Sequence, residues 1–160
     1  MTWPFPMESA HPLVVHFPIA LLLTAVLLDL LALALQRPAW HRVALWNLGL
    51  GTLGAGIAVW SGLRAAEVAK HTFEIHQVME LHQKLGIATL IIGSVVAAWR
   101  LGTRDRLGPR SRAAATLLMA AMAGTLAYGA HLGGRLVYEF GVGGAFGAAG
   151  RAVSPDHHEH

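Results

Sequence analysis

The chain has 160 residues, of which 54% are hydrophobic and 13% charged, a composition too apolar for an ordinary soluble domain. It contains no cysteine, which excludes disulfides, thiolate metal sites and covalently attached c-type haem. The formal net charge of +3 is small and indicates no nucleic-acid surface. We therefore predict an integral membrane protein.

Four apolar segments follow along the chain, each close to the ~20 residues that cross a bilayer core. They cover about 12–35, 43–63, 82–101 and 113–133. Short connections join the first two and the last two, so we predict an all-α fold, an up-and-down four-helix bundle forming a single membrane domain over 1–160. The amphipathic stretch before the third segment is expected either to extend that helix or to lie along the interface. The glycine-rich tail, 134–160, is expected to be mobile.

Arginine is concentrated in the two short connections, which hold seven of the twelve basic residues. The positive-inside rule places these connections in the cytoplasm. Both termini are therefore predicted on the periplasmic side of a bacterial inner (cytoplasmic) membrane, with the chain crossing it several times. Cleavage of the first segment as a signal peptide is disfavoured, because it has no basic region before it and is too long.

Histidine gathers on the predicted outer side, where four residues stand at the ends of three helices. His11 and His16 open the first segment, His82 opens the third, and His131 closes the fourth. His11 and His16 are about 140° apart around a regular helix. Both can therefore face one ligand only if the helix is distorted, as Pro18 could do, or if one of them lies off its end. Unpaired polar groups are costly in hydrocarbon, so these imidazoles must be hydrated, hydrogen-bonded or bound to a ligand.

A b-type haem is the ligand that this arrangement favours, because it takes two axial imidazoles from facing helices. The first and third helices of such a bundle are commonly diagonal partners, which suits His16 with His82. His11 and His131 are then a second axial pair or partners of haem propionates and quinone. The cationic residues placed to neutralise propionates are Arg64, Lys84 and Arg135.

The segments HPLVVHFPIALL, LHQKLGIATL and AHLGGRLVYEFGVG resemble the DUF2231 family of small bacterial four-helix membrane proteins. This resemblance covers nearly the whole chain. It implies the four-helix architecture and an association with c-type cytochrome modules, and its motif histidines correspond to His11, His16, His82 and His131. Many relatives have histidine where this chain has Glu139, so no role carries over to that position.

Three functional hypotheses follow. The first is an electron-transfer subunit that binds haem b near the periplasmic face and links quinol with a c-type cytochrome or a larger respiratory complex. The second is a membrane protein that binds zinc or another divalent metal, or copper, through the same four histidines, with Glu74, Glu80 and the HHEH tail as added ligands. The third is a structural subunit of a membrane complex, and oligomerisation is compatible with all three. No pattern indicates an independent enzyme activity. Asp29 lies a turn or two from the cytoplasmic end of the first segment, where an ionised carboxylate is costly unless it is paired. We expect a hydrogen bond to Asn47 or a solvated helix end, and a role in proton uptake is the alternative.

Overall fold

The structure, a computed structural model, describes residues 7–68 and 72–142. These residues form four long helices and no strand. The helices are α1 (Met7–Ala34), α2 (Pro38–Val68), α3 (Phe73–Gly102) and α4 (Pro109–Tyr138). Each is long and apolar enough to cross a membrane, as the predicted all-α membrane bundle requires.

The helices extend beyond the predicted apolar segments. The amphipathic stretch before the third segment is divided between the end of α2 and the beginning of α3, so part of it does extend the third helix. The α4 helix continues to Tyr138, past the expected start of the tail, and 143–160 lie outside the described residues. The α1 helix is unbroken through Pro18, which removes the basis for turning His11 and His16 toward one ligand.

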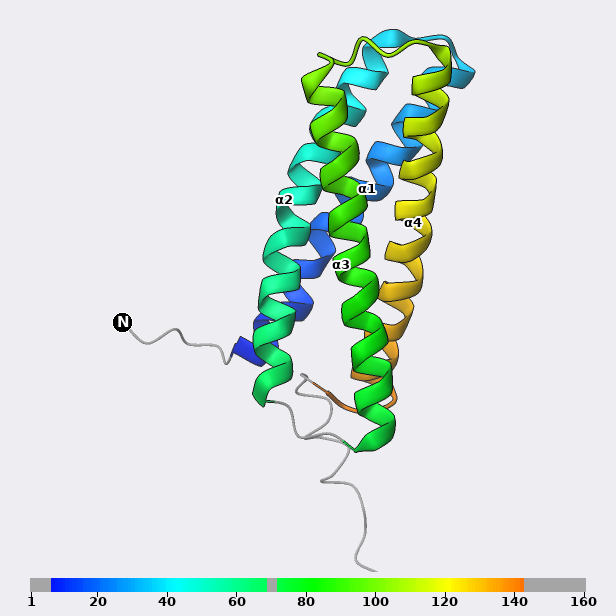
Figure 1. The fold of residues 1–160 in the computed structure, drawn as a ribbon. Coiled ribbons are helices and arrows are strands. Elements are labelled where there is room, and N and C mark those ends of the chain that lie inside the picture. Colours follow the sequence, from blue (N-terminus) through cyan, green and yellow to red (C-terminus); the bar gives the residue numbers. More distant parts are fainter. Residues whose placement is uncertain (1–6, 69–71, 143–160) are drawn as a thin grey trace, which may run out of the picture.

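The four helices run up and down, and each is antiparallel to the next (Figure 1). α1 packs against α2 and α4, and α3 packs against the same two helices, so α1 and α3 are diagonal partners as predicted. We call the end where α1 begins and α4 ends the histidine end. The opposite end, with the connections 35–37 and 103–108, is the arginine end. This arrangement brings His11 and His82 to one end and Asp29 to the other.

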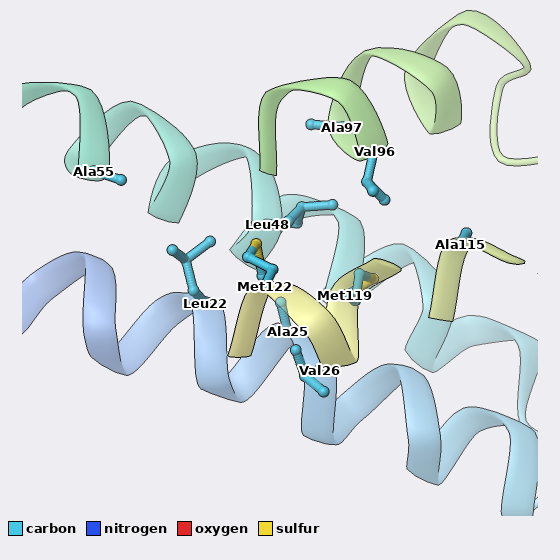
Figure 2. Packing of buried hydrophobic residues seen from close by; sticks show 10 residues of the cluster. All are labelled: Leu22, Ala25, Val26, Leu48, Ala55, Val96, Ala97, Ala115, Met119 and Met122. Carbon is cyan, nitrogen blue, oxygen red and sulfur yellow. The ribbon is translucent and has the colours of Figure 1, made fainter. Parts of the chain in front are cut away.

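All four helices contribute to the apolar core (Figure 2). Its large, fully buried side chains lie between the middle of the bundle and the arginine end, and they are Leu22, Leu48, Val96, Met119 and Met122. Leu13, Leu53 and Leu117 are at least 70% exposed on the outside. An apolar exterior of this kind is suited to contact with lipid.

Glycine lets α1 approach α2 closely. A Cβ atom on Gly51 would lie 2.8 Å from Leu22 Cδ2, and one on Gly54 would lie 3.0 Å from Phe17 Cδ1. Both glycines therefore occupy positions where a side chain would push the helices apart. This is the close packing through small residues that is typical of membrane helices.

Candidate functional site

Two histidines from the diagonal helices meet at the histidine end. The ring of His11 on α1 lies against the ring of His82 on α3, with 6.4 Å between ring centroids and an interplanar angle of 83°. Both side chains are half-buried. The structure thus brings together two of the four histidines singled out from the sequence.

The hydrogen bonds of His11 determine which ring nitrogen carries its proton. Its Nδ1 lies 2.9 Å from Ser61 Oγ. The Ser61 hydroxyl donates its single proton to the carbonyl oxygen of Ala58, 3.0 Å away, so it can only accept from His11 Nδ1–H. The lone pair of neutral His11 is therefore on Nε2.

His82 has the same tautomer for a simpler reason. Its Nδ1 lies 2.8 Å from the carbonyl oxygen of Gly129 on α4, and a carbonyl oxygen can only accept. Nε2 of His82 therefore also carries a lone pair. Histidines that bind metals usually donate their other ring N–H to a carbonyl or similar acceptor, which fixes both tautomer and orientation.

Two glycines make room for these imidazoles. A Cβ atom on Gly62 of α2 would lie 2.9 Å from His11 Cε1, and one on Gly133 of α4 would lie 3.1 Å from His82 Cε1. By contrast, a Cβ atom on the neighbouring Gly134 would meet nothing within 4 Å. Each ring thus packs directly against the backbone of an adjacent helix.

Burial lowers the pKa of His11, and the positive charge that His82 can carry lowers it further. A hydrogen bond to the Ala58 backbone partly opposes this effect by raising the pKa. The net direction is downward from the ordinary value of 6.5. Neutral His11, with its Nε2 lone pair available, is therefore favoured near neutral pH.

The other two histidines lie elsewhere at this end. His16 is exposed, as its angular separation from His11 on a continuous helix requires. His131 shares an outward face of α4 with Gly124 and Tyr128, and its ring stacks on that of Tyr128 at a centroid distance of 6.3 Å. The structure thus places His11 beside His82, and the pairing of His16 with His82 stays a prediction.

The cationic residues expected near propionates each have an acidic partner on their own helix. Arg64 pairs with Glu67, Lys84 with Glu80 and Arg135 with Glu139, and the Arg135 guanidinium also lies 5.9 Å from the centre of the Phe140 ring. A shallow depression of about 300 Å³ opens on the outer surface of α4. It is lined by His131, Gly134, Arg135, Tyr138 and Glu139.

The described residues bear directly on the hypothesis of a bare metal ion. Within 7–68 and 72–142, no three histidine, aspartate or glutamate side chains are grouped closely enough to hold one ion. Protein sites for zinc usually have three or four protein ligands. The His11 and His82 pair supplies two imidazoles.

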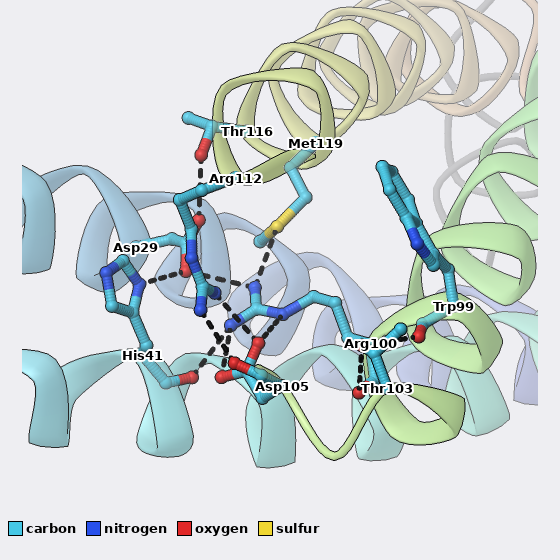
Figure 3. Close-up of polar contacts among 9 residues, drawn as sticks. All are labelled: Asp29, His41, Trp99, Arg100, Thr103, Asp105, Arg112, Thr116 and Met119. Atoms are coloured by element: carbon cyan, nitrogen blue, oxygen red, sulfur yellow. Dashed lines mark hydrogen bonds and ion pairs between the residues drawn. The ribbon is translucent and has the colours of Figure 1, made fainter. Parts of the chain in front are cut away.

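A second polar site occupies the arginine end, around Asp29 (Figure 3). Its Oδ1 accepts from His41 Nδ1 at 2.7 Å, and its Oδ2 accepts from Thr116 Oγ1 at 3.0 Å. The same Oδ1 forms an ion pair with Arg100 Nη1, 3.0 Å away. Partners from the other three helices thus converge on this buried carboxylate. The predicted pairing with Asn47 is wrong, because the Asn47 side-chain amide donates to the carbonyl oxygen of Val43 on its own helix.

Arg100 is fully buried and links Asp29 to the connection between α3 and α4. Its Nε and Nη2 donate to the two carboxylate oxygens of Asp105 at 3.0 and 3.2 Å, and Nη2 also donates to the carbonyl oxygen of His41. Asp105 further accepts from Arg112 Nη1 at 2.8 Å. Two arginines thus balance two aspartates, as buried charges require. We call the six residues Asp29, His41, Arg100, Asp105, Arg112 and Thr116 the ion cluster.

Sequence reasoning missed the residues that orient the histidine pair. Gly129 and Gly133 form a GxxxG pattern, which is a recognised signal for close helix packing, and Ser61 next to Gly62 combines a hydroxyl with a small residue. Arg100 was missed because its position at a helix end resembles a topology signal. The acidic residue in the following connection, Asp105, was the available indication of its pairing.

Comparison with known proteins identifies the family. The sequence profile of a family described as predicted membrane proteins, DUF2231, matches residues 8–145. The matched region contains all four helices, the histidine pair and the ion cluster. Comparisons with curated proteins and with solved structures give no match. The match over most of its length shows that the chain belongs to the DUF2231 family of predicted membrane proteins.

Proposed function

We propose that this protein is a membrane electron-transfer subunit that binds a b-type haem between His11 and His82 at the histidine end. One observation carries the proposal: two imidazoles from diagonal helices lie in a T-shaped contact, and each has its Nδ1–H engaged in a hydrogen bond that leaves the lone pair on Nε2. A bound haem would supply one-electron redox chemistry.

The spacing of the rings supports this ligand. With metal–nitrogen bonds of about 2 Å, two imidazoles on opposite sides of one ion have ring centres about 6 Å apart. The observed separation is 6.4 Å. A zinc or copper site with three or more protein ligands needs at least three suitable side chains close together, and the described residues contain no such group. Haem needs two, because its macrocycle supplies the remaining nitrogens.

The position of the site favours exchange of electrons with partners at the membrane surface. His11 precedes the apolar span Leu13–Ala34, so the histidine pair lies where a membrane-bound quinol and a c-type cytochrome or larger respiratory complex can both approach. We place the quinone headgroup in the depression beside His131, whose ring and the Tyr138 hydroxyl can form hydrogen bonds with its oxygens.

Absorption spectroscopy tests the haem proposal. Protein expressed with adequate haem supply and purified in detergent should show a Soret band, with sharp α bands after reduction. His11→Ala and His82→Ala should each abolish this spectrum, while His16→Ala and His131→Ala should retain it. If the haem spectrum were lost in His16→Ala and retained in His11→Ala, the result would instead support His16 and His82, the pair predicted from the sequence. A colourless protein with stoichiometric copper or zinc would contradict the proposal.

A glycine pair provides a matched test of the ligand geometry. Gly133→Ala places a methyl group 3.1 Å from His82 Cε1, whereas Gly134→Ala adds one in open space. Only the first substitution should alter the position or intensity of the reduced α band, because only it moves an axial imidazole. Equal effects of both substitutions would show that the spectrum reports helix packing in general.

The quinone assignment has its own test. Replacing His131 with Leu should weaken binding of a soluble quinone analogue, measured by titration in detergent, and should leave the absorption spectrum unchanged. Unchanged quinone affinity in this variant would remove the depression from the proposal without affecting the histidine pair.

A further inference from the structure

The arginines at the arginine end fall into two groups. Arg100 and Arg112 belong to the ion cluster, where Asp29 and Asp105 balance their charges. The other five are exposed and form no ion pair with any side chain in 7–68 or 72–142, and they are Arg37, Arg42, Arg104, Arg106 and Arg110. We call these five the arginine ring. The two aspartates are the only acidic residues at this end in the described chain, so the ring is uncompensated.

The ion cluster fixes the chain next to three members of the arginine ring, Arg42, Arg104 and Arg106. Arg42 follows His41, whose carbonyl oxygen accepts from Arg100. Arg104 and Arg106 flank Asp105, which binds Arg100 and Arg112. Arg110 stands two residues before Arg112, and the Arg37 carbonyl oxygen accepts from the Trp40 backbone. The two connections lie at the same end of the bundle (Figure 1). The five like charges stand in these connections or in the first two turns of the helices that follow them, so they are concentrated at this end.

We propose that the arginine ring binds the phosphate groups of anionic phospholipids in the leaflet at this end. The ring stands where the apolar spans end, which is the depth of the lipid headgroups. Trp40 is partly exposed beside it, and tryptophan is enriched at that depth. Long arginine side chains can extend along apolar helix surface while their guanidinium groups reach the phosphates.

The choice of residue supports phosphate as the ligand. All seven Lys and Arg residues at this end of the described chain are arginine, and Lys84, the lysine that the structure describes, lies toward the histidine end. Membrane orientation depends on lysine and arginine alike, so orientation alone does not require this exclusive use of arginine. The planar guanidinium donates two parallel hydrogen bonds to one phosphate, which the lysine ammonium cannot do.

Lipid retention by the purified full-length protein tests the proposal. Native mass spectrometry in a neutral detergent should count more bound phosphatidylglycerol than phosphatidylcholine when both are supplied equally. Arg104→Gln with Arg106→Gln should reduce that preference several-fold, and lysine at both positions should restore it only in part. Arg64→Gln with Lys84→Gln, which removes two charges from the other end, should leave the preference unchanged.

Three outcomes would overturn the proposal. The first is an unchanged lipid preference in the Arg104 and Arg106 glutamine variant, with its helical circular dichroism and unfolding midpoint in neutral detergent retained. The second is an equal loss in the variant of Arg64 and Lys84. The third is displacement of the lipid by glycerol phosphate at an equal concentration, which would assign the ring to a soluble phosphate. Because these measurements do not depend on haem, they also stand apart from the proposed function.

Discussion

Asp29 accepts hydrogen bonds from His41 on α2 and Thr116 on α4, and it forms an ion pair with the fully buried Arg100 on α3. Removing one partner from a buried ion pair costs about 3–5 kcal/mol, because the remaining charge loses its compensation. We expect Asp29→Ala to lower the free energy of unfolding by about this amount, and Asp29→Asn to lower it substantially as well. Denaturant titration of the protein in detergent micelles measures the change.

Asn47→Ala is the control for this prediction. The Asn47 side chain bonds only within its own helix among the interactions described, so its removal should change the free energy of unfolding by less than about 0.5 kcal/mol. If Asn47→Ala lowered the free energy of unfolding more than Asp29→Ala does, the result would contradict this prediction.

His11 is expected to make stability depend on pH. Because its pKa in the folded protein is below 6.5, the unfolded chain binds more protons than the folded chain at pH values between the folded pKa and 6.5. The free energy of unfolding therefore rises with pH through this window and levels off above it. His11→Asn should flatten this part of the curve, measured as unfolding free energy from pH 5 to 8. An unchanged slope would show that His11 does not contribute to it.

At the scale of elements, the contact between α1 and α2 depends on the absence of a side chain at Gly51. A methyl group there would lie 2.8 Å from Leu22 Cδ2 and 3.1 Å from Leu21 Cβ, and Leu22 is fully buried in the core. We expect Gly51→Ala to destabilise the protein by about 1–3 kcal/mol through overpacking. Gly49→Ala, on the same helix with nothing within 4 Å of the added atom, should have little effect in the same unfolding experiment.

The sequence was sufficient to locate the helices because their existence depends on hydropathy and length. It was not sufficient to determine which face of each helix turns toward the core. Lipid and protein core are both apolar, so a membrane helix has no strong amphipathic pattern. This is why the prediction from the sequence paired His16, and not His11, with His82: the angular separation of His11 and His16 was known, but the face of α1 that turns inward was not. Gly51, Gly54 and Gly62 on α2 receive that face, and their role depends on contacts formed in three dimensions.

In the ion cluster, too, the sequence indicated one feature and did not indicate the others. Asp29 stands in an apolar segment, which indicated that it needs a partner. Its charged partner is Arg100, which is 71 positions away in the chain, so no local pattern connects the two residues. The geometry of the ion cluster also depends on the backbone of Arg104 and Asp105, which have positive φ angles of 50° and 55°. Two consecutive residues other than glycine in this conformation are uncommon, and sequence patterns did not indicate them.

At the scale of the whole molecule, four antiparallel spans place the beginning of α1 and the end of α4 on the same side. The concentration of arginine at the opposite end predicts that this side is the periplasm. A C-terminal alkaline phosphatase fusion should therefore be active, and a fluorescent protein that matures only in the cytoplasm should be dark at the same position. A fusion within the 103–108 connection should give the reverse pattern, and agreement of both fusions at both sites is needed for this orientation.

Because the core is unevenly placed along the bundle, the two ends should differ in how readily they open locally. The large, fully buried side chains and the ion cluster fasten the helices between their middle and the arginine end, so local opening there breaks many contacts at once. The other end has fewer such contacts, and its helix tips can separate while the rest stays assembled. Amide hydrogen exchange should accordingly be faster at the histidine end than at the arginine end. The haem that we propose would then be able to enter the folded protein at the histidine end without global unfolding.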